Sequence, residues 1–146
     1  MHPPLQRRAL MAIVIVGAAG LAAVVWAALM PVVFASREEP FEIPKGTWAR
    51  RMAGNKVEIL PSHVYLTLGI RNVLLLENHD DVPQIFGPTL MMPGQSFRLP
   101  FDVASSYQFA CTAHASGQMT VVVDERPDTP WRRLEWRIRR LYRSIA

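Results

Sequence analysis

The distribution of apolar and polar positions divides the 146-residue chain into three parts. The first apolar run extends from Ala9 to Ala35 and contains no charged residue. A helix needs about 20 apolar residues to cross the hydrocarbon core of a bilayer, so this run predicts a single transmembrane helix. A cleaved signal peptide is the alternative, but its apolar core usually spans only ~7–15 residues. The pattern favours an uncleaved anchor, assigned to residues 1–35.

Short apolar runs separated by turn residues fill the middle of the chain. The runs rich in β-branched, aliphatic and aromatic residues are 57–60, 64–70, 72–78, 96–101, 107–111 and 119–123. Pro-Ser, Pro-Gly and Ser-Gly pairs lie between several of them. Short strands at this spacing, with turn signals between them, are typical of a β-sandwich or barrel. We assign this domain to residues 41–126, with residues 36–40 as a linker.

The last part of the chain, residues 127–146, has the pattern of an amphipathic helix. Asp128 and Thr129 are candidate caps, and Pro130 suits the first helical position. Apolar residues then recur at intervals of three and four, with arginines in most of the remaining positions. Such a helix suits an anionic membrane surface, an acidic protein partner or a site on its own domain. The residues expected to make this contact are Trp131, Arg133, Leu134, Arg137, Ile138, Arg140 and Leu141.

The distribution of charge and the absence of certain motifs exclude two classes of function. The formal net charge is +4, but six arginines and one glutamate lie between residues 132 and 143, so the basicity belongs mainly to the C-terminus. Because the domain is expected to be anchored in a membrane, we expect no nucleic acid as a partner. We also expect no enzyme activity, because the sequence has no glycine-rich phosphate loop, no zinc spacing and no evident pair of nucleophile and base.

The stretch YQFACTAHASGQM, from Tyr107 to Met119, carries the candidate chemistry. It contains the only cysteine, Cys111, with His114 three residues later and Met119 five residues after that. Two imidazoles and one thiolate with a distant thioether are the ligands of a blue-copper site. Taken singly, each residue is more simply explained as a core or loop residue. Together, on one tight loop, they point to a metal site.

The spacing C-x2-H-x4-M between two strands resembles the ligand loop of the cupredoxins, particularly the plastocyanin and amicyanin type. The similarity covers residues 41–124, because FEIPKGT, ILPSHVYLTLGIRNVLLLENHDDVP and GPTLMMPGQSFRLPF resemble other strands of that family. The resemblance implies an all-β fold, a cupredoxin-like Greek-key β-sandwich, to which this chain adds one N-terminal transmembrane helix and a C-terminal amphipathic helix. It also implies copper at Cys111, His114 and Met119. Because the family's members are extracytoplasmic electron carriers, it places the domain on the periplasmic or extracytoplasmic side.

The chain departs from the family pattern at the first histidine. The loop NHDDVPQI keeps the asparagine, aspartate and proline of N-x-D-x-x-P-H-N, but Gln84 occupies the ligand position. Ile85 replaces the asparagine that supports the cysteine loop. An amide oxygen is a weaker copper ligand than imidazole, and lost support around a ligand also weakens a site. Gln84 itself, His79 on the same loop, or water are the candidates for the fourth ligand.

Two functions are compatible with these observations. The first is an accessory or structural subunit of a membrane electron-transfer complex, respiratory or photosynthetic, with a degenerate copper site. The second is a working one-electron carrier or relay in which Cys111, His114 and Met119 bind copper. Gln84 and Ile85 favour the first function, and the three retained ligands favour the second. The expected partners are the lipid bilayer, other subunits of the complex and anionic lipid headgroups, and the cofactor is either none or copper.

Overall fold

The computed structural model describes residues 4–55 and 59–145, and the side chains from Arg7 onward within these ranges. The chain forms two compact units. One combines the N-terminal residues up to Val32 with the residues from Pro127 onward, and the other extends from Val33 to Arg126.

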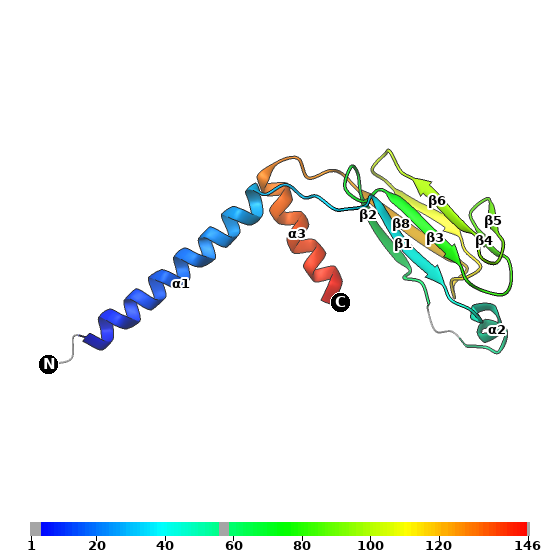
Figure 1. Ribbon diagram of the computed structural model, residues 1–146, viewed down its shortest axis with the longest axis horizontal. Helices are drawn as coiled ribbons and strands as arrows, with labels where there is room; N and C mark the ends of the chain where they lie inside the picture. Colours follow the sequence, from blue (N-terminus) through cyan, green and yellow to red (C-terminus); the bar gives the residue numbers. More distant parts are fainter. Residues whose placement is uncertain (1–3, 56–58, 146) are drawn as a thin grey trace. The chain divides into compact units, whose positions relative to one another are not determined.

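The unit from Val33 to Arg126 is built mainly of β-strands (Figure 1). Its strands are β1 (Glu38–Ile43), β2 (His63–Thr67), β3 (Val73–Asn78), β4 (Gln84–Phe86), β5 (Thr89–Met91), β6 (Ser96–Pro100), β7 (Ser106–Ala110) and β8 (Gln118–Asp124). One sheet has the order β1-β3-β6, a second has the order β2-β8-β7, and β4 and β5 form a hairpin. The pairs β1–β3 and β2–β8 are parallel and the others are antiparallel.

The predicted β-sandwich is confirmed, with three differences. A short helix, α2 (Thr47–Met52), follows β1, so the unit is not strictly all-β. Strand β1 begins at Glu38, inside the segment expected to be a linker. The strand expected at 57–60 falls partly outside the described residues, and Ile59 and Leu60 lie in a bend.

Alternation of side chains builds the core between the two main sheets. Successive residues of a strand point to opposite faces, so every second residue is available for the core. The inward positions are filled by Val64 and Leu66 of β2, Leu74 and Leu76 of β3, and Val121 and Val123 of β8, all of them buried. A register shift of one residue would turn this buried set toward the other face of its sheet, so the burial of these residues fixes the pairing.

The β4–β5 hairpin lies against β7, close to the candidate metal loop. The Phe86 and Phe109 rings are 4.8 Å apart, and the Gly87 N–H donates to the Ala110 carbonyl at 2.8 Å. Gly87 has φ of +54°, and a Cβ there would lie 3.1 Å from the Phe109 ring. The hairpin turn therefore requires glycine both for its backbone angle and for this close approach.

The other unit contains α1 (Pro4–Leu29) and α3 (Pro130–Ile145). The stretch from Arg7 to Leu29 is long and apolar enough to cross a membrane. Helix α3 begins at Pro130, as the sequence predicted, and the Thr129 hydroxyl accepts a hydrogen bond from the Arg132 N–H at 3.3 Å. This is the arrangement of a helix N-cap.

Two arginines of α3 contact the end of α1. Arg133 donates to the Leu29 carbonyl at 3.1 Å. Arg137 donates to the Met30 carbonyl at 3.0 Å and also to that of Ala27. The last carbonyls of a helix have no partner within the helix, and basic side chains there also interact favourably with the helix dipole. Arg133 and Arg137 therefore cap α1.

Candidate metal centre

The loop after β7 carries the predicted ligands. Cys111 forms an isolated β-bridge with Phe86 of β4, and its N–H donates to the Gly117 carbonyl at 2.9 Å. The His114 N–H donates to the Cys111 carbonyl at 3.2 Å, which closes a tight turn. Cys111, His114 and Met119 are 2%, 1% and 0% exposed. The structure thus buries all three predicted ligands where β4, β7 and β8 meet.

Gln84, at the start of β4, is fully buried and both ends of its amide are engaged. Nε2 donates to the Asp80 carboxylate at 2.9 Å, and Oε1 accepts from the Thr112 hydroxyl at 2.6 Å. The amide therefore joins its own loop to the residue that follows Cys111. Thr112 also pairs with Ile85, whose N–H donates to the Thr112 hydroxyl at 2.8 Å and whose carbonyl accepts from the Thr112 N–H at 3.0 Å.

This arrangement explains how Ile85 can stand where the resemblance expects a supporting asparagine. The Ile85 side chain is 43% exposed, and its backbone is hydrogen-bonded to the cysteine loop. The Thr112 hydroxyl accepts from that backbone and donates to Gln84, so the loop has polar support from Thr112.

Asp80 organises the polar side of the site. Its carboxylate accepts from the N–H groups of Gly46 and Trp48, both at 2.8 Å, from that of Asp81 at 2.9 Å, and from the Gln84 amide. Burial acts to raise the pKa of Asp80, but these four hydrogen bonds outweigh it and hold the pKa below its ordinary value of 3.8. Asp80 is therefore an anion at neutral pH and joins the start of α2 to β4.

Arg51 of α2 holds the cysteine loop from the other side. Its guanidinium donates to the Ala113 carbonyl at 2.7 Å, to that of Thr112 at 3.0 Å and to that of His114. These three contacts between the Arg51 guanidinium and backbone carbonyls fix the loop without a metal.

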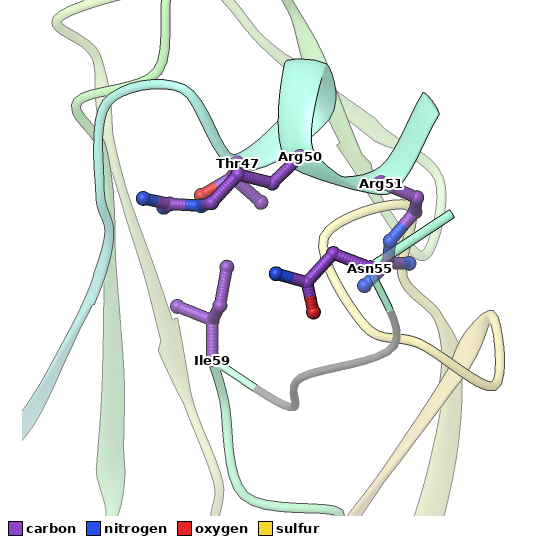
Figure 2. A pocket seen from close by; sticks show the side chains of 5 residues that line it. All are labelled: Thr47, Arg50, Arg51, Asn55 and Ile59. Atoms are coloured by element: carbon purple, nitrogen blue, oxygen red, sulfur yellow. The ribbon is translucent and has the colours of Figure 1, made fainter. Parts of the chain in front are cut away.

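Beside α2 lies a pocket of about 180 Å³ (Figure 2). Its lining residues are Thr47, Arg50, Arg51, Asn55 and Ile59.

The donor atoms fit copper in kind, and one of them, the His114 Nδ1, is engaged by protein groups. The His114 Nδ1 accepts from the Ser116 N–H at 3.2 Å and lies 2.8 Å from its hydroxyl, so a metal at this nitrogen would displace both contacts. Burial raises the pKa of the Cys111 thiol, although the N–H groups of Ala113 and His114 and the charge of Arg51 oppose this. The thiol is thus protonated at neutral pH, and a metal would have to displace its proton.

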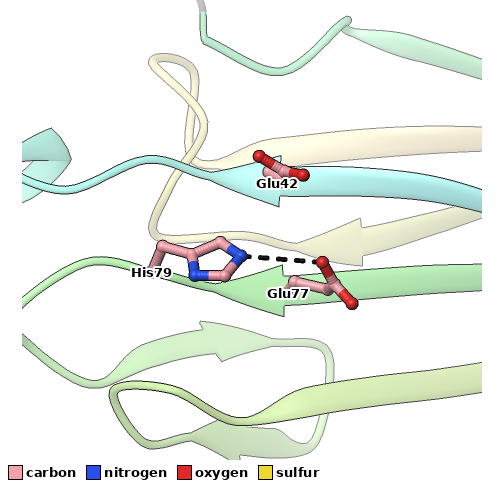
Figure 3. Close-up of side chains that lie close together, drawn as sticks. All are labelled: Glu42, Glu77 and His79. Atoms are coloured by element: carbon pink, nitrogen blue, oxygen red, sulfur yellow. Dashed lines mark ion pairs between the residues drawn. The ribbon is translucent and has the colours of Figure 1, made fainter.

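The structure places His79 away from the buried ligands. It lies with Glu77 and Glu42 over β1 and β3, where its Nε2 is 3.6 Å from a Glu77 carboxylate oxygen (Figure 3). His79 is exposed, whereas Gln84 is fully buried beside Thr112. Of the two candidate side chains for the fourth ligand, only Gln84 lies at the cysteine loop.

The predicted contact residues of the tail fall into two groups. Trp131, Ile138 and Leu141 are exposed in this unit. The half-buried group is Arg133, Leu134 and Arg137, of which the two arginines cap α1. The Arg140 guanidinium lies 5.3 Å from the Trp136 ring centroid.

Sequence reasoning missed three functional residues: Asp80, Thr112 and Arg51. Asp80 stands at the aspartate position of N-x-D-x-x-P-H-N, two residues after Asn78, so that pattern was a signal for it. Thr112 directly follows Cys111, and that proximity is the signal that could have found it. Arg51 has no such signal, because it reaches the loop from 61 to 63 residues away in the chain.

No protein-family model and no curated protein matches the chain. Among solved structures, a purple cupredoxin from Nitrosopumilus maritimus is 19% identical, with a TM-score of 0.45, and the match covers 58% of this chain and 98% of that one. An oxidised mutant of amicyanin is 18% identical, with a TM-score of 0.43, and the match covers 62% of this chain and 86% of that one.

Proposed function

We propose that this chain is a membrane-anchored, cupredoxin-like accessory subunit of a membrane electron-transfer complex, with a degenerate copper site and no enzymatic activity. The carrying observation is the Gln84 amide, which is buried and engaged at both ends by Asp80 and Thr112. A glutamine with both of these contacts is part of the hydrogen-bonded core. To ligate copper, its oxygen would have to share or give up the 2.6 Å contact with the Thr112 hydroxyl.

The same contacts support the proposal of a degenerate site. Copper would be held by Cys111, His114 and Met119 and would supply one-electron redox chemistry. A trigonal field requires a second imidazole, which Gln84 does not provide.

The test is copper analysis and visible absorption of the full-length protein purified in mild detergent. We expect no intense thiolate-to-copper absorption from the wild-type protein with added Cu²⁺. Gln84→His should gain that absorption, because it adds an imidazole at the buried position. Ile85→His is the matched control: it adds the same group at the next residue, whose side chain is 43% exposed, and should gain no colour.

A working electron relay is the second candidate, and the burial of all three donors favours it. Intense absorption from wild-type protein with about one copper per chain would overturn the accessory function and establish copper binding. A reversible one-electron potential measured on that protein would then support the relay. If Gln84→His also stays colourless, the site has diverged beyond this one ligand.

Membrane anchoring by α1 rests on its composition and on the arginine caps. The stretch from Arg7 to Leu29 could also be a signal sequence. Removal of α1, however, would take away the carbonyls to which Arg133 and Arg137 donate. Trp26 lies at this junction, with the Arg137 guanidinium 5.9 Å from its ring centroid. Tryptophan is enriched at membrane interfaces, so this end of α1 suits the membrane surface.

The mass of the intact chain from native membranes separates these alternatives, since an uncleaved anchor retains the mass of α1. Sidedness follows from protease accessibility on oriented vesicles. We expect the sandwich to be digested only from the extracytoplasmic side, and digestion from the cytoplasmic side would overturn this orientation.

We further propose that α3 attaches this end of the chain to anionic lipid or to another subunit. Trp131, Leu141 and Tyr142 expose apolar surface on a helix rich in arginine. Arg140→Glu with Arg143→Glu reverses charge at exposed positions and leaves the two caps of α1 intact. Weaker binding to vesicles of anionic lipid would support lipid contact. Unchanged vesicle binding with loss of co-purifying subunits would support a protein contact.

A further inference from the structure

Two glutamates face each other on the outer surface of the sandwich. Glu42 of β1 and Glu77 of β3 are direct partners in the parallel register of these strands. His79 lies two residues beyond Glu77, and its backbone N–H donates to the Ile43 carbonyl at 2.9 Å, which holds its backbone beside β1. One ligand-capable atom of each side chain lies within 4.8 Å of the others (Figure 3).

The neighbouring acidic residues differ in having cationic partners. Glu38 pairs with Arg98 at 2.8 Å, Glu39 with Arg71, and Asp81 with Lys45 at 3.1 Å. Within residues 4–55 and 59–145, neither Glu42 nor Glu77 has an ion pair with lysine or arginine.

Like charges directly opposite each other on paired strands are destabilising. The pair of Glu42 and Glu77 is therefore a place where a bound cation would relieve a cost that no lysine or arginine among the described residues offsets.

We propose that Glu42, Glu77 and His79 bind a divalent transition-metal ion of the zinc class, independently of the buried cysteine loop. Zinc takes imidazole nitrogen and carboxylate oxygen, commonly from three protein side chains with water in the fourth position. Magnesium prefers an octahedral shell of oxygen and keeps much of its water, so the imidazole selects against it.

The geometry allows this site to close around an ion. Zinc bonds to oxygen and nitrogen are about 2.0–2.2 Å long, so the three donor atoms must draw closer together than their present spacing of up to 4.8 Å. The His79 side chain is 54% exposed and that of Glu77 is 34% exposed, so both can rotate without disturbing the core. The backbone positions are fixed by the β1–β3 pairing and need not move.

This site affects how copper binding to the protein is interpreted. Cu²⁺ binds nitrogen and oxygen sites more tightly than Zn²⁺ does, so added copper would also occupy Glu42, Glu77 and His79. Copper held there has no thiolate ligand and cannot give the intense thiolate-to-copper absorption. Copper content alone therefore does not report on Cys111, and absorption and His79→Gln must be combined with it.

The experiment is thermal unfolding of the full-length protein in mild detergent, first with EDTA and then with ZnCl₂ or MgCl₂ at equal concentration. An ion that binds only the folded state raises the Tm. Zinc should raise the Tm of the wild-type protein, and magnesium should not. The shift should disappear in His79→Gln and in Glu42→Gln, with zinc affinity by calorimetry at least about 10-fold weaker.

Two variants serve as controls. His63→Gln removes an exposed histidine from β2, in the other sheet, and should keep the zinc shift. Cys111→Ser removes the buried thiol and should also keep it. In EDTA, Glu42→Gln should unfold at the wild-type Tm or above, because it removes one of two opposed charges. That measurement separates loss of binding from loss of folding.

Three results would overturn the proposal: no zinc shift in the wild-type protein, an equal shift in His79→Gln, or an equal shift with magnesium. Loss of the shift in Cys111→Ser would instead place the zinc at the cysteine loop and overturn it as well. None of these outcomes bears on the colour of Gln84→His, so the proposed function is tested separately.

Discussion

Replacement of Asp80 by alanine should strongly destabilise the sandwich. Asp80 is 3% exposed and its carboxylate accepts four hydrogen bonds. These bonds join the start of α2, the loop after β3, and Gln84 of β4. Removal of the carboxylate therefore releases three segments from one another at the same point.

The expected magnitude follows from the four donors. A hydrogen bond to a charged group contributes about 1.5–3 kcal/mol, but the N–H groups of Gly46 and Trp48 lie near the surface and can regain water. The Gln84 amide is fully buried, and an unsatisfied buried donor costs about 1–3 kcal/mol. We expect Asp80→Ala to lower the free energy of unfolding by about 3–5 kcal/mol. Asp80→Asn, which keeps one acceptor oxygen, should cost about half as much.

The assay is thermal unfolding of the full-length protein, followed by circular dichroism. Each kcal/mol shifts the Tm of a domain of 60–100 residues by about 4–8 °C, so Asp80→Ala should lower it by at least about 12 °C. Asp81→Asn is the control: its side chain is 63% exposed and pairs with Lys45, and exposed pairs contribute only about 0–1 kcal/mol. Equal, small shifts for both variants would refute this account of Asp80.

The stabilisation that the Asp80 carboxylate gives the folded state should decrease at acidic pH. Because the pKa of Asp80 is lowered on folding, its ionisation stabilises the folded state fully above its ordinary value of 3.8. This contribution is lost as the pH falls through the lower folded-state pKa. The difference in Tm between wild-type protein and Asp80→Asn should therefore stay constant near neutrality and shrink below about pH 4. A difference that shrinks between pH 8 and 6 would contradict this assignment.

Three further perturbations test other parts of the structure. Thr112→Val keeps the side-chain shape but removes the hydroxyl bonded to Gln84, so chemical or thermal unfolding should show a loss of about 1–3 kcal/mol. Cys111 should react with iodoacetamide far more slowly at pH 7.5 than after unfolding in urea, because burial shields the thiol and raises its pKa; equal rates would show that the loop opens freely. Truncation after Asp128 should leave the unfolding transition of the sandwich unchanged and weaken binding to anionic vesicles, and a large loss of sandwich stability would show instead that the tail is part of that fold.

Long, strongly patterned elements were predictable from the sequence. The runs that became β3 and β8 alternate or concentrate apolar residues, and the tail repeats them at helical spacing. Strand β1 gave a weaker signal, because it lies at the end of the order β1-β3-β6 and contains Pro40, which removes a backbone donor and suits an edge strand. Strands β4 and β5 have three residues each, and α2 has six, so none is long enough to show a period.

The candidate site, like the fold, has one part that could be predicted from the sequence and one part that could not. Cys111, His114 and Met119 were identifiable because their spacing is local to one loop. The contacts that hold this loop are not local: Thr112 meets Gln84 across 28 residues, and Arg51 meets the loop across more than 60. Such contacts depend on how the sheets pack, and no pattern of neighbouring residues encodes them.

The contacts of Gln84 explain why position 84 holds glutamine and not simply any residue without an imidazole. A buried polar position is costly unless both its donors and acceptors are satisfied. The Gln84 amide meets this condition, because it offers a donor to Asp80 and an acceptor to Thr112 at once. Alanine here would leave the Asp80 carboxylate with one donor fewer and a gap beside Cys111. Glutamine instead completes the network, so the buried polar groups at this end of the sandwich are satisfied by protein side chains.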